Sequence, residues 1–209
     1  MGWDRALFQW INGLAGHSAL LDRLVSGIAD DYFMIVTMCL VLVAMWFGTR
    51  EQEARQHNQL TVIAAMSSMG LATGFVALSN LLFVRNSVLA GTALNALFNK
   101  PRPFDAEAAV NLLFYRPTDP SFPSNMAAVV FGLAIAVWLR NRKVGFWLMG
   151  MATLASFARI YVGIHYPADI LGGAFFGLLG VGLAFLLIKV LWPVKRFIFW
   201  ALEKLYLGG

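Results

Sequence analysis

The stretch ILGGAFFGLLGVGLAFLLI, residues 170–188, decides the fold class, because it runs for 19 positions without one charged side chain. A helix that crosses the hydrocarbon core of a membrane needs about 20 apolar residues. Working outward from this stretch, further uncharged runs of suitable length cover residues 32–49, 60–84 and 121–139. A fifth, residues 144–158, becomes long enough if it continues through Arg159, and a charged residue inside a span indicates a functional site.

These runs predict an all-α integral membrane protein with five transmembrane helices. An alternative count of six divides residues 60–98 at positions 85–87. Helices are expected because an open strand would leave backbone groups unpaired in lipid. The composition agrees, since 59% of the 209 residues are hydrophobic and only 13% are charged. It excludes a soluble globule and a nucleic-acid partner.

The ends of the chain differ from the spans in character. Residues 1–29 predict an interfacial amphipathic segment, in which Leu7, Trp10, Ile11 and Leu14 share one helical face. Residues 192–209 predict a basic cytoplasmic tail. With no internal repeat or linker, we expect residues 1–209 to form a single membrane-embedded domain.

Basic loop residues set the orientation, because cytoplasmic loops are enriched in Lys and Arg. The loop at residues 140–143 (Arg-Asn-Arg-Lys) and the basic C-terminal flank are therefore expected to be cytoplasmic. Residues 85–120 and 162–169 then share the outer side in either span count. The protein is thus predicted to be multi-pass, with a functional site that faces the exterior.

Three polar clusters lie on that outer side, at residues 99–104, 119–126 and 158–169. In the last, Arg159, His165 and Asp169 follow the pattern R-x5-H-x3-D. Asp169 lies four positions after His165, so it can orient the imidazole and leave the other ring nitrogen free to attack. The guanidinium of Arg159 is a fork of donors suited to phosphate. Together they indicate phosphoryl chemistry, and the alternative is a helix-capping His–Asp pair beside an interfacial arginine.

The other two clusters add candidate phosphate ligands. Arg102 lies between Pro101 and Pro103, which restrict the backbone and present the guanidinium rigidly. Ser124 is predicted to cap the helix that follows, and the free N–H groups of a helix start also bind anions. Asn125 adjoins them, and Lys100 is a nearby cation. The alternative for residues 99–104 is a proline-rich turn with basic residues facing lipid headgroups.

In order and spacing, the three clusters resemble the signatures of the type-2 phosphatidic acid phosphatase superfamily: K-x6-R-P, P-S-G-H and S-R-x5-H-x3-D. The resemblance is greatest to the undecaprenyl-diphosphate phosphatases of the bacitracin-resistance type. It implies a metal-independent mechanism without a cofactor. In it, His165 forms a phosphohistidine, Asp169 orients His165, and Arg102, Arg159 and Ser124 hold the phosphate. A lipid phosphate or diphosphate would be the substrate, in a bacterial cytoplasmic (inner) membrane with the site facing the periplasm or exterior.

Two positions depart from that pattern. Asn95 stands where the superfamily has Lys, and Lys100 or Arg116 is a candidate replacement. Met126 stands where the superfamily has the histidine that protonates the leaving group, and a thioether has no titratable proton. The only other histidines are His17 and His57; His57 is expected on the cytoplasmic side, whereas His17 is expected on the outer side.

Two hypotheses from different classes follow. One is a slowed lipid diphosphatase, because the phosphate ester that leaves a diphosphate needs no proton. The other is a pseudo-phosphatase that binds or translocates a lipid phosphate. A third, an engineered inactive variant, is disfavoured by two adjacent departures at residues 125–126. The small residues between Gly172 and Gly182 permit close helix packing, which is expected to be intramolecular, although a homo-oligomer stays open.

Overall fold

The computed structural model describes residues 2–85, 87–191 and 200, and every regular element in that part of the chain is helical. The α-helices are α1 (Trp3–Asn12), α2 (Ala19–Ala29), α3 (Phe33–Phe47), α4 (Gln52–Ser79), α5 (Ala93–Phe98), α6 (Pro103–Ala106), α7 (Asn125–Arg140), α8 (Arg142–Tyr161) and α9 (Pro167–Val190). A π-helical turn, η1 (Asn80–Val84), extends α4, and a short 3-10 turn, η2 (Ser87–Leu89), follows it.

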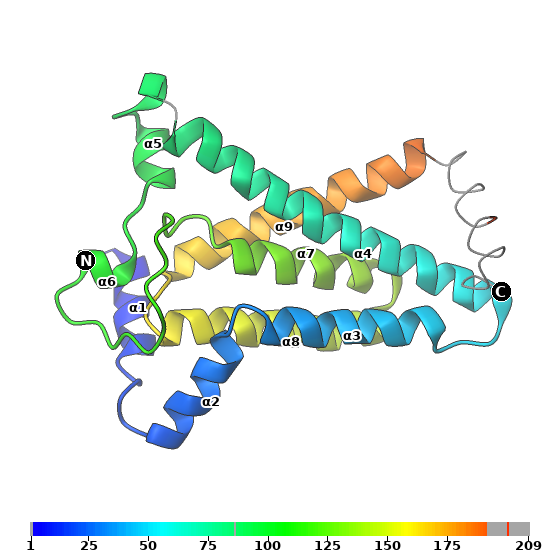
Figure 1. The fold of residues 1–209 in the computed structure, drawn as a ribbon, viewed down its shortest axis with the longest axis horizontal. Coiled ribbons are helices and arrows are strands. Elements are labelled where there is room, and N and C mark those ends of the chain that lie inside the picture. The colour runs from blue at the N-terminus through cyan, green and yellow to red at the C-terminus, as the bar shows by residue number, and fades with distance from the viewer. Residues whose placement is uncertain (1, 86, 192–199, 201–209) are drawn as a thin grey trace.

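The long helices form an elongated bundle around α7 (Figure 1). Helix α7 contacts α4, α8 and α9, and α4 also crosses α9. The buried side chains of α7 are largely small or β-branched. Four of them are wholly inaccessible to solvent: Ala127, Ala128, Ala134 and Ala136. Small side chains let three neighbours approach one helix closely, so α7 is the axis on which the rest of the fold is built.

Glycines of α9 make that close approach possible. A Cβ added at Gly177 would lie 2.8 Å from both the carbonyl oxygen of Ala128 and the backbone nitrogen of Gly132 on α7. A Cβ at Gly180 would lie 2.6 Å from the carbonyl oxygen of Ser68 on α4. The intramolecular packing expected of these glycines is therefore confirmed. Gly182 on the same helix faces open space.

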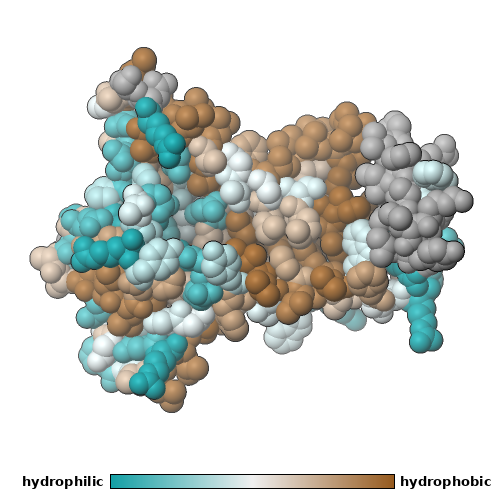
Figure 2. All heavy atoms as spheres, in the orientation of Figure 1, coloured by the Kyte–Doolittle hydropathy of each residue, from teal (hydrophilic) through white to brown (hydrophobic). Residues whose placement is uncertain are grey.

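The bundle has the apolar length that a membrane requires. Among the described residues, the segments Gln52–Val84, Arg142–Tyr161 and Pro167–Val190 are each long and apolar enough to span, and α2 with α3 adds a fourth if this bent pair is one span. Helix α7 is apolar but shorter. Hydrophobic side chains cover the middle of the molecule, and hydrophilic ones gather at the end that carries α1, α5 and α6 (Figure 2). The fold is an all-helical, multi-pass membrane protein, and the count of five spans stays a prediction.

Residues 87–98 form only η2 and the six-residue helix α5. At about 1.5 Å per residue, α5 is far too short to cross a membrane, so this segment adds no sixth span. Asn95 binds it back to η1, donating a hydrogen bond of 2.7 Å from Nδ2 to the carbonyl oxygen of Phe83. The rings of Phe83 and Phe98 stack at 4.7 Å in the same region.

The N-terminal segment has two apolar faces rather than one. On α1, Leu7 and Trp10 are exposed, as is Leu14 just after the helix, whereas Phe8 and Ile11 are buried against the bundle. Of the four side chains predicted to share one helical face, Ile11 is therefore buried, whereas the other three are exposed. The remaining row of exposed Trp and Leu side chains suits the membrane interface. The Trp rings favour the headgroup level, and an apolar helix face with Leu side chains is buried at the boundary with the acyl chains.

The two ends of the bundle have different roles. At one end His57, on the first turns of α4, meets Arg140 at the end of α7, with His57 Nε2 3.3 Å from the carbonyl oxygen of Arg140. This contact brings His57 to the basic loop at residues 140–143, and the sequence predicted both on the same side of the membrane. The three polar clusters lie at the opposite end. All of the predicted tail at residues 192–209 except Trp200 lies outside the described residues.

Candidate active site

The turn between α8 and α9 shapes the site. Gly163 has a φ of +87°, in the left-handed region that favours glycine. A Cβ at that position would also lie 2.9 Å from the carbonyl oxygen of Asn111. The turn reverses the chain within a few residues, so that Arg159 at the end of α8 and His165 before α9 lie near one another. Pro167 then starts α9 at its first turn, where its missing N–H is not needed.

His165 is held in one tautomer by the backbone. Its Nδ1 lies 3.0 Å from the carbonyl oxygen of Ser121. Because a carbonyl only accepts hydrogen bonds, Nδ1 must carry the proton. Nε2 therefore carries the lone pair and lies 3.3 Å from Nη1 of Arg102. The imidazole has the form of a nucleophile beside a fixed positive charge.

Burial lowers the pKa of His165 to about 4. The guanidinium charges of Arg102 and Arg159 act in the same direction, and Asp169 opposes them. The imidazole is consequently neutral at neutral pH, which is the state a nucleophilic nitrogen needs.

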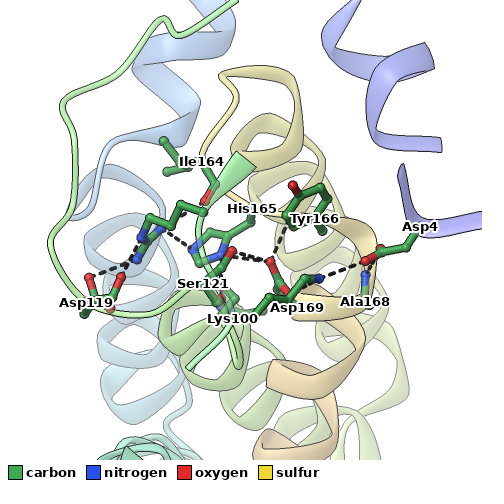
Figure 3. Close-up of polar contacts among 12 residues, drawn as sticks. Asp4, Lys100, Asp119, Ser121, Ile164, His165, Tyr166, Ala168 and Asp169 are labelled. Atoms are coloured by element: carbon green, nitrogen blue, oxygen red, sulfur yellow. Dashed lines mark hydrogen bonds and ion pairs between the residues drawn. The ribbon is translucent and has the colours of Figure 1, made fainter. Parts of the chain in front are cut away.

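Asp169 is the hub of a polar network that also contacts His165 (Figure 3). Its Oδ2 lies 3.7 Å from His165 Nδ1, beyond hydrogen-bond range. The same oxygen accepts hydrogen bonds of 2.5 Å from Ser121 Oγ and 2.8 Å from the backbone N–H of Tyr166. Its Oδ1 accepts one of 2.9 Å from Lys100 Nζ. Ser121 links the two side chains, because its carbonyl accepts from the imidazole and its hydroxyl donates to the carboxylate.

Arg102 is fixed by the loop that follows it. Its Nε and Nη2 each donate a bond of 2.9 Å, to the carbonyl oxygen and to Oδ1 of Asp119 respectively. Its Nη1 donates one of 2.9 Å to the carbonyl oxygen of Ile164. The side chain is buried, so the two prolines and these three bonds leave the guanidinium little freedom beside His165.

Arg159 enters from α8. Its Nη1 donates bonds of 3.0 Å to the carbonyl oxygen of Ala29 and 2.9 Å to Oδ1 of Asp31. Its Nε is buried and finds no partner among the described residues. A buried donor without a partner is costly, and an anion in the neighbouring cavity would satisfy it.

These groups open onto a cavity of about 270 Å³. Its lining includes the site residues His165, Arg102, Arg159, Asn125 and Met126, together with Asp31, Tyr32, Ile35, Tyr115, Pro117, Asp119 and Val129. A second cavity, of about 770 Å³, shares Arg102 and Asp119 with it and adds Arg85, Lys100 and Arg116. The two adjoining cavities, each lined by both arginines and aspartates, meet at Arg102.

The remaining predicted residues are placed differently. Ser124 caps α7 as expected, accepting a bond of 3.4 Å from the backbone N–H of Ala127, but it is buried and does not line the 270 Å³ cavity. Lys100 faces Asp169 and Asp4, with Nζ 2.8 Å from Asp4 Oδ2, and lies outside that cavity. Asn95 binds the carbonyl oxygen of Phe83 in η1. Of the three histidines in the chain, only His165 lines the 270 Å³ cavity.

Several residues of the site were not singled out from the sequence. Ser121 and Asp119 lie within the second polar cluster, at residues 119–126, so their proximity to the site could have been predicted from that cluster. Asp31 and Tyr115 gave no signal, because neither belongs to a motif and the chain brings them to the site from distant positions. Asp4 likewise comes from α1, where it accepts a bond of 2.8 Å from the backbone N–H of Ala168.

Comparison with known proteins agrees with this geometry. Residues 75–193 match the family model described as the PAP2 superfamily. The chain belongs to the PAP2 superfamily. The match covers more than half of the chain and contains every residue of the three polar clusters. The predicted resemblance to type-2 phosphatidic acid phosphatases is therefore confirmed.

Individual relatives show which branch of the superfamily this PAP2 protein resembles. It is 32% identical over 167 residues to "Undecaprenyl-diphosphatase BcrC" of Bacillus subtilis, covering 79% of this chain and 74% of that one. It is 28% identical to "Bacitracin transport permease protein BcrC" of Bacillus licheniformis, covering 95% and 80%. Its fold is similar to the crystal structure of Aquifex aeolicus LpxE, with a TM-score of 0.64 at 25% identity over 88% of this chain and 96% of the other. The resemblance to phosphatases of the bacitracin-resistance type is confirmed.

Proposed function

We propose that this membrane PAP2 protein hydrolyses a polyprenyl diphosphate, such as undecaprenyl diphosphate, to the monophosphate through a phosphohistidine. The observation that carries the proposal is the tautomer of His165, which lines the cavity with its protonated Nδ1 on Ser121 and its unprotonated Nε2 beside Arg102. The names of relatives such as the Bacillus subtilis protein support the substrate class.

The chemistry takes two steps. In the first, Nε2 of His165 attacks the terminal phosphorus, and the bond from that phosphorus to the bridging oxygen breaks. The polyprenyl monophosphate leaves with the electron pair. Arg102 and Arg159 stabilise the negative charge on the transferred group, which is the main catalytic contribution in phosphoryl transfer. In the second, water attacks the phosphorus, the P–N bond breaks, and inorganic phosphate leaves.

Met126 limits the substrate range. It lines the cavity beside His165, and its thioether cannot protonate a leaving group. A monoester such as phosphatidic acid expels an alkoxide, which needs that proton, whereas a diphosphate expels a phosphate ester that is stable as an anion. General acid catalysis contributes roughly 10²–10⁴-fold, and we expect most of this loss to fall on monoesters.

The location follows from the sidedness of the bundle. We propose that the protein lies in a bacterial cytoplasmic membrane with its active site toward the periplasm or exterior. The basic loop at residues 140–143 lies at the end of the bundle opposite His165, which supports this orientation by the enrichment of cytoplasmic loops in Lys and Arg.

Phosphate release in detergent tests the proposed activity. Purified protein is given undecaprenyl diphosphate or phosphatidic acid, and inorganic phosphate is measured. We expect faster release from the diphosphate and none from His165→Ala. His17→Ala is the matched control, because His17 is exposed and does not line the cavity; it should retain activity. Equal rates on the two substrates would show that the preference for diphosphate is wrong.

A second candidate function is binding without turnover. The observation that favours it is Met126 itself, which stands where the superfamily has its acid. A protein that only binds would release no phosphate from either substrate, yet would retain undecaprenyl diphosphate in a filter-binding assay, with equal affinity in His165→Ala. Release that depends on His165 excludes this function.

A further inference from the structure

We propose that Asp31 is the general base of this site, taking the proton of the water that hydrolyses the phosphohistidine. The inference rests on the proposed function and assigns to Asp31 the proton transfer that a side chain at position 126 cannot perform here. The inference starts from the residues that line the 270 Å³ cavity. Met126 cannot accept the proton of the attacking water, so another group in the cavity must accept it.

The titratable groups of the cavity leave one candidate. Arg102 and Arg159 stay protonated in proteins, and His165 is the nucleophile. Asp119 and Asp31 each pair with an arginine, but the side chain of Asp119 is 61% exposed to solvent, whereas that of Asp31 is 34% exposed and more enclosed with the site. Tyr115 donates its hydroxyl proton to Asp31, and this hydrogen bond raises the pKa of Tyr115. A phenol with a raised pKa is a poor base at neutral pH, which leaves Asp31.

Asp31 is well placed for the role. It lies in the break between α2 and α3, where the chain bends by 57°, and its carboxylate lines the cavity with His165. Its Oδ1 lies 2.9 Å from Nη1 of Arg159, and its Oδ2 accepts a bond of 2.6 Å from the hydroxyl of Tyr115. Each carboxylate oxygen has two lone pairs, so a water proton still finds an acceptor.

The charge state also fits. Burial raises the pKa of Asp31, but hydrogen bonds from Tyr115 and Arg159 outweigh it, and the net pKa lies below the ordinary value. The group is therefore an ionised carboxylate at neutral pH. When Arg159 turns its Nη1 to a bound phosphoryl group, Asp31 loses one of those bonds and becomes a stronger base.

The step balances. The oxygen of the water forms a bond to phosphorus while one proton passes to a carboxylate oxygen of Asp31. The P–Nε2 bond breaks, and its electron pair returns to His165. Inorganic phosphate leaves, and Asp31 returns its proton to solvent before the next cycle.

The test separates the two chemical steps. Undecaprenyl diphosphate labelled with ³²P in its terminal phosphate is mixed rapidly with enzyme and stopped in alkali, which preserves phosphohistidine. With Asp31→Asn we expect a burst of about one undecaprenyl monophosphate per enzyme, labelled protein that accumulates, and steady phosphate release slower by roughly 10²–10⁴-fold. Glu53→Gln is the control, the same carboxylate-to-amide change at an exposed residue in the first turn of α4 that lines neither cavity, and it should behave as the unmodified protein.

A second variant keeps the outcome interpretable. Asp31→Asn combined with Met126→His supplies a different titratable group to the cavity, and we expect it to recover much of the lost release. Steady release from Asp31→Asn at the unmodified rate would overturn the role of Asp31. Loss of the burst together with release, with no recovery by Met126→His, would also overturn it, because Asp31 would then support phosphate binding. Failure of the unmodified protein to form labelled intermediate would instead contradict the proposed function.

Discussion

At the scale of single residues, the site depends on a neutral imidazole enclosed by positive charge. The protonated Nδ1 of His165 donates to the carbonyl oxygen of Ser121 rather than to a carboxylate, and the hydroxyl of Ser121 donates to Asp169. A carboxylate 3.7 Å away stabilises the imidazole less than a hydrogen-bonded one. Burial and the charges of two guanidinium groups therefore lower the pKa of His165 by more than Asp169 raises it, and the ring stays unprotonated at neutral pH.

This charge state predicts the titration of His165. In ¹⁵N-histidine-labelled protein, we expect its NMR signals to show the neutral Nδ1–H tautomer through pH 5 and protonation near pH 4, since burial lowers its pKa to about 4. His165→Gln assigns the signals. The unfolded chain binds this proton near pH 6.5, so His165 lowers stability as the pH falls from there toward 4. Protonation of the folded protein near pH 6.5 would contradict the enclosure of the ring.

The sequence predicted which side chains meet more accurately than how they bind. Arg102, Arg159 and His165 were expected to converge, and the structure brings them to one cavity. The spacing of four positions between His165 and Asp169 indicated a pair, and the two side chains do approach to 3.7 Å, while the hydrogen bond of the imidazole goes to the carbonyl oxygen of Ser121. Asp31 could not be predicted, since its place in the cavity depends on how α2 and α3 pack against α8.

At the scale of elements, hydropathy located the apolar parts of the helices but not their ends. The structure starts α4 at Gln52, eight residues before the predicted span at residue 60, because a helix continues past the membrane into its polar flank. Conversely, α7 starts at Asn125 rather than residue 121. Pro123 disfavours helical geometry in the residue before it, and Ser124 caps the helix. Arg159 does lie within α8, as the predicted extension required.

The contact between α7 and α9 predicts that valine lowers the melting temperature far more at Gly177 than at Gly182. Gly177→Val places new atoms against the α7 backbone, where a Cβ already meets Gly132 and Ala128 at 2.8 Å. Overpacking costs about 1–3 kcal/mol, so we expect a clearly lower melting temperature in detergent. Gly182→Val on the same helix is the control, with the same change in helix propensity and no close neighbour. Equal melting temperatures for the two variants would mean that α7 and α9 are not in tight contact.

At the scale of the whole molecule, one end of the bundle carries the chemistry and the other carries the basic loop. The N-terminal segment belongs to the first end, because Asp4 joins α1 to α9 through Lys100 and the N–H of Ala168. The sequence predicted this polarity from its Lys and Arg residues, whereas the contact of α1 with the site depended on long-range packing that no local pattern records.

The orientation of the bundle in the membrane can be tested by cysteine labelling, because the chain has a single cysteine, Cys39. In a Cys39→Ser background, Arg116→Cys should react with a membrane-impermeant maleimide on spheroplasts, because Arg116 is exposed at the active-site end. Lys143→Cys, exposed near the opposite end, should react only after the membrane is permeabilised. The reverse pattern would place the active site in the cytoplasm and overturn the proposed orientation.

The position of His165, beside the last turn of α8 and just before α9, governs how a lipid meets the site. A headgroup at the end of a bundle is within reach of the imidazole while its hydrocarbon tail stays in the bilayer. The enzyme then never extracts its substrate, and encounters take place by lateral diffusion in two dimensions. Turnover is accordingly set by the mole fraction of substrate in the membrane, and added inert lipid slows the reaction by surface dilution.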